Sequence, residues 1–207
     1  MAAKIAIINT STRPIRVGPS VTAFVKEILE KADPSADITT VDVADFNLPV
    51  FDEPAAPAMI PAMAQHTKEH SKAWSAEIAK YDAYILVANE YNFGMSGATK
   101  NAIDFLYNEW IGKPIYIVTY GIMGATNASE QLKAVLTGMK LKVVETRPNL
   151  AFHGLQAGPD MYAAMSKGEL GEGSKKDWET DKKEELIKGF TELKELLASP
   201  PKAEAVA

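Results

Sequence analysis

Apolar and polar positions along the chain predict strands and helices in turn. Short, almost wholly apolar runs occupy residues 5–8, 83–88 and 114–120, and apolar and polar residues alternate over 38–43. Continuous apolar runs of this length are typical of strands covered on both faces, whereas alternation is typical of a strand with one exposed face. The pattern therefore predicts four strands, and a fifth is expected within 141–150.

Between these strands, apolar residues recur at helical spacing. The first such stripe consists of Val21, Phe24, Val25, Ile28 and Leu29. Further helices are predicted near 62–80, 97–109, 132–139 and 176–197, where the same three-to-four-residue spacing recurs. The connections over 48–61 and 152–176 are long enough to border an active site or a partner subunit.

Regular alternation of strands and helices predicts an α/β protein, with a parallel sheet joined by right-handed crossovers and helices on both faces. Five strands favour a flavodoxin-like three-layer α/β/α sandwich with a five-stranded parallel sheet. We expect residues 1–197 to form a single domain and 198–207 a disordered tail. In such sheets ligands bind beyond the carboxyl ends of the strands, so the loops after the first, third and fourth strands are expected to carry the function.

Composition narrows the function classes. The chain of 207 residues has no cysteine, which excludes thiol catalysis, thiolate metal sites and disulfides. A net charge of -5 argues against broad nucleic-acid binding, and no apolar run is long enough to span a membrane. The N-terminal segment is too short and too soon polar for a secretory signal. We therefore expect a cytoplasmic protein with a small-molecule partner.

The first candidate loop, 9–20, suits a phosphate group. It leads directly into a helix, whose free amides and dipole favour an anion, and it is rich in hydroxyl and guanidinium groups. These come from Thr10, Ser11, Thr12, Arg13, Arg16 and Ser20. The alternative is a helix cap in a solvated loop. The loop lacks the glycine spacing of dinucleotide and P-loop motifs, which points to a monophosphate such as FMN.

The second candidate loop, 90–97, combines aromatic residues with glycines. Tyr91 and Phe93 offer flat surfaces to a tricyclic ring, Asn92 can bond the ring's pyrimidine edge, and Gly94 and Gly97 permit close backbone approach. Alternatively, the two aromatic residues seal the sheet edge against a helix. The third loop, 119–125, adds two glycines and flexible apolar cover.

Three blocks together resemble the NADPH-dependent FMN reductase family, in particular its FMN-dependent NAD(P)H:quinone and azo reductases. The resemblance covers about residues 4–150. The blocks are Ser11-Thr12-Arg13; Glu90-Tyr91-Asn92-Phe93-Gly94 with Lys100-Asn101-Ala102-Ile103-Asp104; and Lys113-Pro114 before Tyr120-Gly121-Ile122-Met123-Gly124. Two positions depart from the family pattern: Thr10 stands where glycine is common, and Asn89 where proline is frequent.

The resemblance implies roles for specific residues. Ser11 and Arg13 are placed at the FMN phosphate, and the segment containing Arg16, Val17, Gly18 and Ser20 closes around it. The flavin ring is expected to be lined by Glu90, Tyr91, Asn92, Phe93 and Gly94, with Tyr120 and Gly121 at another edge. Lys100 and Asp104 are expected to be structural or interfacial rather than catalytic, and their spacing permits an ion pair on one helix face.

The activity that the resemblance implies is two-electron transfer from NADPH or NADH through bound FMN to a quinone, a free flavin or an azo compound. No catalytic side chain is predicted, because the flavin does the chemistry. A homodimer with flavins near the interface is also implied. The alternatives are a flavodoxin-type electron carrier or an FMN-binding redox sensor without NAD(P)H turnover. A phosphorylated receiver domain is disfavoured because the first and third predicted strands end at Asn9 and Asn89 rather than at aspartates.

Other candidate residues have competing interpretations. His66, Glu69 and His70 match a zinc-binding H-x-x-E-H pattern, but no third ligand is evident, so a solvated helix is favoured and no metal site is predicted. His153 is interpreted as a capped or partly buried histidine, or as a neighbour of the nicotinamide site. The aromatic residues near the end of the third helix could serve an interface or the core; they are Phe105, Tyr107 and Trp110.

Overall fold

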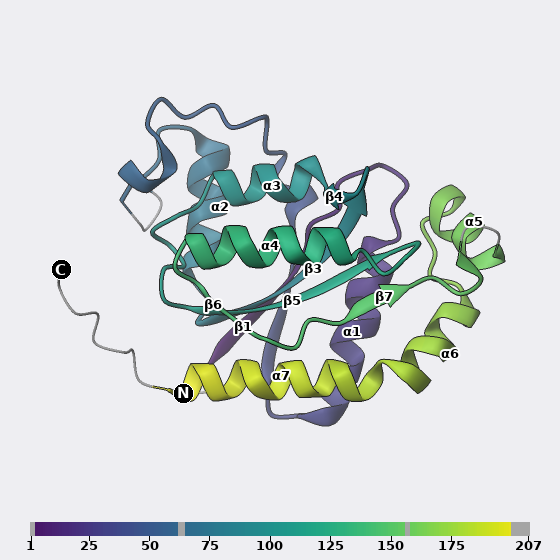
Figure 1. Ribbon diagram of the computed structural model, residues 1–207. Helices are drawn as coiled ribbons and strands as arrows, with labels where there is room; N and C mark the ends of the chain where they lie inside the picture. The colour runs from purple at the N-terminus through teal and green to yellow at the C-terminus, as the bar shows by residue number, and fades with distance from the viewer. Residues whose placement is uncertain (1–2, 62–64, 156–157, 200–207) are drawn as a thin grey trace.

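Strands and helices follow one another as the apolar pattern predicts (Figure 1). The computed structural model describes residues 3–61, 65–155 and 158–199. The strands are β1 (Lys4–Asn9), β2 (Asp37–Asp42), β3 (Ala83–Tyr91), β4 (Gly94–Met95), β5 (Pro114–Gly121), β6 (Lys142–Val143) and β7 (Asn149–Ala151). The α-helices are α1 (Gly18–Ala32), α2 (Glu69–Ala79), α3 (Gly97–Asp104), α4 (Thr126–Gly138), α5 (Pro159–Ser166), α6 (Glu172–Asp181) and α7 (Lys183–Ala198). Two short 3-10 helices, η1 (Val43–Phe46) and η2 (Pro57–Met59), lie between β2 and α2.

The strands form one sheet in the order β2-β1-β3-β5-β6, with β7 also paired to β5 and β4 paired to β3. The β3–β4 hairpin is antiparallel, whereas the other pairs are parallel. In the register, Ile7 lies beside Thr40 on one side and Ile85 on the other. This strand order, with its reversal between β1 and β3, is the flavodoxin-like arrangement. The predicted fold class is therefore confirmed, although the sheet has more strands than the five predicted.

The extra strands arise from the fifth strand position and from the hairpin. The segment predicted as one strand within 141–150 is split into β6 and β7, which pair with opposite ends of β5. Pro148 lies directly before β7 and has no amide to donate to a ladder, although its carbonyl accepts a hydrogen bond from Thr119 N (3.0 Å). The strand is therefore interrupted next to Pro148, which can accept but cannot donate a backbone hydrogen bond.

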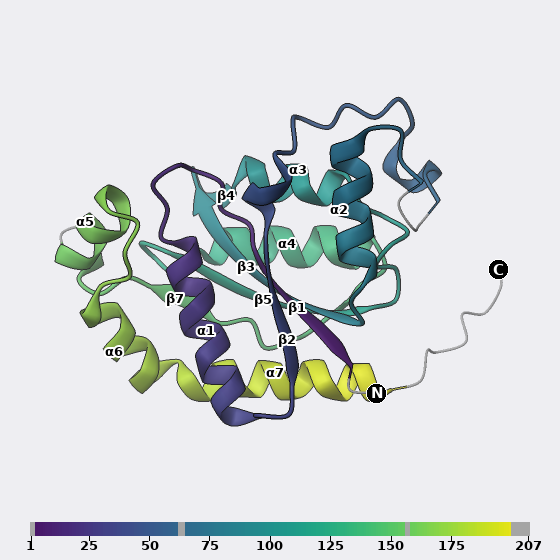
Figure 2. The ribbon, with the colours of Figure 1, turned by 180° about the vertical axis from the view of Figure 1, so that it is seen from behind.

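Helices cover both faces of the sheet (Figures 1 and 2), and an apolar core lies between each helical layer and the sheet. On one face, the predicted α1 stripe packs with α7, where Leu29 and Phe190 meet Ile7. On the other face, α2, α3 and α4 supply residues such as Trp74, Ile103 and Leu132. Burial on both faces explains why β1, β3 and β5 are almost wholly apolar. It also leaves the carboxyl ends of these strands as the place where polar loops gather.

Several helix boundaries differ from the prediction. Of the helix expected over 62–80, residues 62–64 lie outside the described residues, and residues 65–68 are not helical; α2 begins at Glu69. The amides of Thr67 and Lys68 donate to the carboxylate of Glu53 (3.1 and 2.9 Å), which caps the helix from a distant loop. The helix start is therefore set by a residue that local spacing does not reveal.

The helix predicted over 97–109 ends at Asp104, because the amide of Tyr107 donates to the Glu109 side chain (2.9 Å) instead of continuing the helical pattern. The helix predicted over 176–197 starts earlier and is broken at Lys182 into α6 and α7. The long connection over 152–176 holds α5, which was not predicted.

Helix α7 reaches Ala198, the first residue of the predicted tail, and residues 200–207 lie outside the described residues. In the described part of the chain, no helix is long and apolar enough to cross a bilayer.

Candidate functional site

A pocket of about 510 Å³ lies at the carboxyl ends of β1, β3 and β5. This volume falls within the range of small-molecule sites, and the location is where ligands bind in doubly wound sheets. Nine predicted site residues line it: Ser11, Arg13, Arg16, Val17, Glu90, Tyr91, Asn92, Tyr120 and Gly121. Its remaining lining consists of Asn89, Ile122, Phe152, Met161, Ala164 and Met165. The structure thus brings together residues from all three predicted loops.

A second cavity of the same volume lies between α4, β7 and α7. Its lining is dominated by charged residues of both signs, including Glu130, Glu145, Glu184 and Lys188. Arg147 in this cavity is already paired with Glu130 (2.8 Å) and with the Ser129 carbonyl (3.0 Å). Aromatic and apolar surface is what a ring-bearing ligand needs, so the pocket at the strand ends is the better candidate.

The two arginines of the first loop have different surroundings. The Arg16 guanidinium donates to Asp42 Oδ1 (2.9 Å) and to the Ser11 carbonyl (2.6 Å), so its charge is already balanced. Arg13 donates to the Ile15 carbonyl (2.7 Å), and its guanidinium carbon lies 6.0 Å from the Tyr91 ring centroid. None of the described carboxylates forms an ion pair with Arg13. Arg13 is therefore the positive charge available to an anionic ligand.

The start of α1 closes the floor of the pocket. A Cβ atom at Gly18 would lie 2.1 Å from Ser11 Oγ and 2.7 Å from the Tyr120 hydroxyl, so only glycine fits there. Ser11 Oγ donates to Asn9 Oδ1 (3.0 Å). Burial raises the pKa of Tyr120, so its hydroxyl keeps its proton throughout the physiological range. Ser20 is turned away from the pocket and donates to the Gly168 carbonyl (3.4 Å).

The β3–β4 hairpin forms the aromatic wall. Its two turn residues, Asn92 and Phe93, have φ values of 50° and 62°, the left-handed pair that a two-residue hairpin needs. This conformation is strained for a bulky residue, and Phe93 is 82% exposed. Gln131 of α4 ties the hairpin down, accepting from the Met95 amide (3.1 Å) and donating to the Phe93 carbonyl (3.4 Å). Phe93 and Gly94 lie outside the pocket lining.

Glu90, the acidic residue of the lining, is already engaged. Its Oε2 accepts a hydrogen bond from the Ala128 amide (3.0 Å) in the first turn of α4. A carboxylate at a helix N-terminus is stabilised by the free amides and the helix dipole. Glu90 therefore links the hairpin to α4, and its backbone borders the pocket.

Some lining residues escaped the sequence prediction. Asn89 ends the parallel part of β3; the sequence marked it as a strand end and as a departure from the family pattern, but not as a binding residue. The wall opposite the hairpin comes from α5, through Met161, Ala164 and Met165. Their i, i+3, i+4 spacing after Pro159 is a helix signal that could have revealed this wall.

Comparisons with known proteins decide the family. The family model for NADPH-dependent FMN reductases matches residues 3–154. The chain belongs to the NADPH-dependent FMN reductase family. It is 52% identical to the NAD(P)H-dependent FMN reductase ntnL of Nectria sp over 202 residues, which are 96% of this chain and 98% of that protein. It is 40% identical to an NAD(P)H-dependent FMN reductase of Schizosaccharomyces pombe over 147 residues, 71% of this chain and 72% of the relative.

Solved structures agree on the fold. FerB of Paracoccus denitrificans, described as a flavoenzyme NAD(P)H:(acceptor) oxidoreductase, matches with a TM-score of 0.63 at 19% identity, covering 94% of this chain and 97% of that chain. The predictions of an oxidoreductase family with FMN and a nicotinamide nucleotide as its cofactors are confirmed by family membership. The matched region ends at residue 154, so the α5 wall lies beyond the part that the family model describes.

The residues of the pocket fit FMN. Arg13 offers an unbalanced charge beside hydroxyl groups, the glycine at position 18 leaves room where a side chain would intrude, and the hairpin presents the Tyr91 ring. In addition, the side chain of Asn89 is buried with both polar atoms unpaired among the described residues. FMN, the cofactor of this reductase family, has a phosphate, a flat ring and polar groups that can pair with Asn89.

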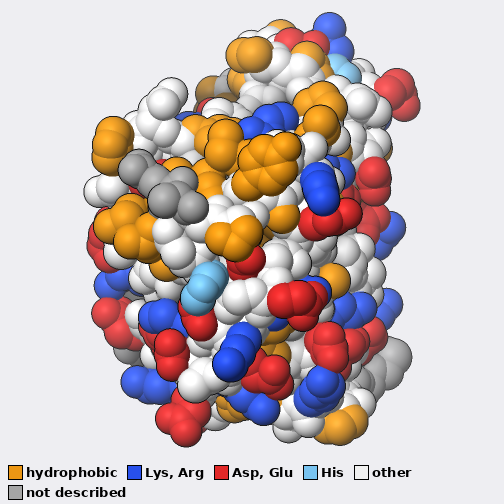
Figure 3. Space-filling view, turned by 90° about the vertical axis from the view of Figure 1, so that its right-hand side faces the viewer, with side chains coloured by type: hydrophobic (Ala, Val, Ile, Leu, Met, Phe, Trp, Pro, Cys, Tyr) orange, Lys and Arg blue, Asp and Glu red, His pale blue; other side chains and the backbone are white. Residues whose placement is uncertain are grey.

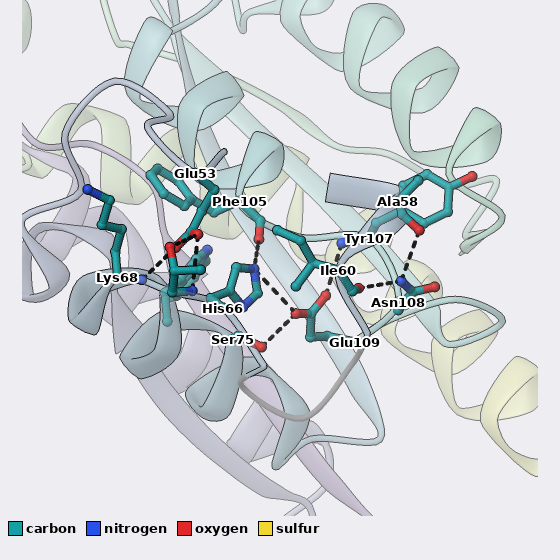
Figure 4. A network of polar contacts seen from close by, with 12 residues as sticks. Glu53, Ala58, Ile60, His66, Lys68, Ser75, Phe105, Tyr107, Asn108 and Glu109 are labelled. Carbon is teal, nitrogen blue, oxygen red and sulfur yellow. Dashed lines mark hydrogen bonds and ion pairs between the residues drawn. The ribbon is translucent and has the colours of Figure 1, made fainter. Parts of the chain in front are cut away.

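The H-x-x-E-H pattern does not form a helical metal site. His66 precedes α2, so the two histidines do not share a helix face, and its 5% exposure contradicts the predicted solvated helix. Its Nε2 donates to the Phe105 carbonyl (3.0 Å) and lies 4.0 Å from Glu109 Oε1 (Figure 4). His70 instead contacts Asp52 (2.9 Å). Among the described residues, no group of three acidic, histidine or cysteine side chains is arranged to hold a metal.

Burial decides between the interpretations of two further features, the aromatic residues after α3 and His153. Phe105 and Trp110 are core residues beneath the sheet face rather than exposed interface aromatics, whereas Tyr107 is half-buried. His153 is exposed, and its Nδ1 pairs with Asp177 (2.7 Å), which raises the pKa of the imidazole. The interpretation of His153 as partly buried is therefore wrong, although its imidazole does have a hydrogen-bond partner.

Lys100 and Asp104 form the ion pair expected from their spacing along α3 (2.5 Å).

Proposed function

We propose that the chain binds FMN in this pocket and uses NADPH or NADH to reduce quinones, free flavins or azo compounds. One observation carries the proposal: Arg13 and the aromatic hairpin line the same cavity. Arg13 has no acidic partner among the described residues, so its charge is available to a phosphate. Relatives support the acceptor class, because they include FMN reductases and, at 28% identity over about half the chain, a quinone reductase of Escherichia coli.

In this proposal each loop holds one part of FMN. The phosphate is held by Ser11 and Arg13, with Arg16 fixing the loop through Asp42. The start of α1 completes this end through Val17 and Gly18, whereas Ser20 stays with the Gly168 carbonyl. The ring is lined by Glu90, Tyr91 and Asn92, whose hairpin geometry depends on Phe93 and Gly94, while Tyr120 and Gly121 border another edge.

The chain's own residues bind and orient rather than react. When bound, FMN supplies hydride acceptance from NAD(P)H and two-electron transfer to the acceptor. Glu90, the lining carboxylate, is held by the Ala128 amide, and Tyr120 is buried with a raised pKa, so neither is placed as a proton donor. We therefore propose no catalytic side chain.

Two measurements on purified protein test this function. Titration with FMN should show saturable binding and a bound-flavin absorbance spectrum. Protein loaded with FMN should then oxidise NADPH or NADH in the presence of a quinone. FMN binding without nucleotide oxidation across quinone, flavin and azo acceptors would instead identify an electron carrier or a redox sensor.

We also propose that residues 1–197 act as one domain and that the enzyme is a cytoplasmic homodimer, with no nucleic-acid or membrane partner. One continuous sheet from residue 4 to residue 151 supports the single domain. Apolar side chains gather on the surface at the pocket end of the molecule (Figure 3), where a second copy could cover them. The exposed ones include Phe93, Met123, Tyr162 and Met165. Light scattering coupled to gel filtration distinguishes a dimer from a monomer.

A further inference from the structure

Asn89 is exceptional among the polar residues of the pocket. Its side chain is buried, with 5% of the residue exposed, and neither Oδ1 nor Nδ2 has a hydrogen-bond partner among the described residues. Buried amides in native proteins are almost always paired, because an unpaired one loses its bonds to water without replacement. A residue that violates this rule while lining a pocket indicates that a ligand supplies the missing partners.

The equivalent residue of the neighbouring strand shows the contrast. Asn9 ends β1 as Asn89 ends the parallel part of β3, and Asn9 is also buried. However, Asn9 Oδ1 accepts from Ser11 Oγ (3.0 Å), and Asn9 Nδ2 donates to Asp42 (3.0 Å). One asparagine is thus built into the protein's own network, whereas the other is left without partners at the same sheet edge.

The position of Asn89 identifies the part of the ligand that it faces. On one side, Val87 accepts hydrogen bonds from Thr10, at the start of the phosphate loop. On the other side, Asn89 is followed directly by the hairpin, and its register partner across the sheet is Tyr120. Asn89 therefore lies between the loop assigned to the phosphate and the hairpin assigned to the ring.

We propose that Asn89 binds the hydroxyl chain that joins the phosphate to the ring of FMN. This inference rests on the proposed function. Hydroxyl groups donate and accept, which matches an amide that has both a free donor and a free acceptor. Both amide atoms are buried in this structure, so pairing with a ligand in the pocket requires a turn about the Cβ–Cγ bond, a soft torsion for asparagine. Asn89 thus binds only the hydroxyl chain of the flavin, and it stands at a position where the family frequently has proline.

Three flavins and two variants test the proposal. FMN carries the phosphate and the hydroxyl chain, riboflavin carries the chain alone, and lumiflavin has neither. Asn89→Leu keeps the size of the side chain, and Asn89→Ala removes it without adding bulk. We expect both variants to bind FMN and riboflavin about tenfold more weakly, the size of one to two neutral hydrogen bonds, and lumiflavin as the wild type does.

A second readout needs no flavin. Because the leucine variant removes an unpaired buried amide, its ligand-free form should melt roughly 2–4 °C higher than the wild type. Riboflavin affinity within twofold of wild type in either variant would overturn the proposal, as would equal weakening of lumiflavin or a lower melting temperature for Asn89→Leu. If the wild type itself binds none of the flavins, the proposed function fails instead, so the two failures are distinguishable.

Discussion

The carboxylates beneath α2 and the amide at the pocket are buried to a similar degree but differ in their partners. We call the first group the α2 network; it consists of Glu53, His66, Ser75 and Glu109 (Figure 4). Glu53 and Glu109 are 8% and 5% exposed, and each accepts at least two hydrogen bonds. Asn89 is 5% exposed and has none from the described residues. The first arrangement stabilises the fold, whereas the second leaves bonding capacity for a ligand.

Glu109 provides the largest test of this contrast. Its carboxylate accepts from Ser75 Oγ (2.6 Å) and from the Tyr107 amide (2.9 Å), both within the protein. Glu109→Ala removes the carboxylate that accepts both of these hydrogen bonds, which should cost about 3 kcal/mol of unfolding free energy. Urea denaturation measures the loss. Glu69→Ala, which removes an exposed partner of Lys72, is the matched control and should change stability by less than about 0.5 kcal/mol.

The comparison is sharpened by flavin titration of the same variant under native conditions. Because Glu109 lies outside the pocket lining, the folded fraction of Glu109→Ala should bind FMN with wild-type affinity. A selective loss of FMN affinity at unchanged stability would show that the α2 network serves binding, and the contrast drawn above would not stand.

Glu53 makes the stability of the α2 network dependent on pH. Burial by itself raises the pKa of this carboxyl, but hydrogen bonds from the Thr67 hydroxyl and from the Thr67 and Lys68 amides outweigh it and hold the pKa at about 2. A lowered folded-state pKa stabilises the protein above the unfolded-state value, and this contribution is lost as pH falls through the folded-state value. The wild type should therefore lose about 2 kcal/mol more than Glu53→Gln between about pH 5 and pH 2.

Chemical denaturation of both proteins across this range gives the difference directly. Other carboxylates protonate in both proteins, so only the difference between them reports on Glu53. Parallel pH profiles for wild type and Glu53→Gln would mean that the capping interaction contributes nothing measurable.

The same contrast explains what the sequence could predict. The apolar runs of β1, β3 and β5 and the loops after them were predictable because local composition records burial on both faces and the polar edge beyond. Glu53 and His66 could not be assigned, because their partners lie 14 to 39 residues away. The unpaired state of Asn89 was equally invisible, since it depends on what surrounds the residue in space. The segment 152–176 was expected to border an active site or a partner subunit, and it does line the pocket, but its helix α5 was missed although the helical spacing was present.

Arg13 tests the pocket side of the comparison with an effect smaller than those in the α2 network. Arg13 has no acidic partner among the described residues, whereas Arg16 is balanced by Asp42. Arg13→Gln should weaken FMN binding about tenfold by removing one charge-assisted contact, and should leave riboflavin binding unchanged. Fluorescence titration of both flavins measures this. If the affinity for riboflavin fell equally, Arg13 would contact the flavin ring rather than the phosphate, consistent with its place over the Tyr91 side chain.

Phe93 offers the smallest effect, and one of opposite sign. Its φ of 62° is strained for a phenylalanine, and the residue is 82% exposed, so the fold gains little from the aromatic ring. Phe93→Gly should therefore raise the unfolding free energy by about 1 kcal/mol, because glycine adopts this conformation freely. Thermal and urea denaturation test the change. Asn92→Gly is the matched control at the neighbouring turn position, where asparagine already tolerates φ of 50° and the gain should be smaller. A destabilised Phe93→Gly variant would instead show that the exposed phenyl ring makes a contact whose stabilisation exceeds the cost of the strained backbone.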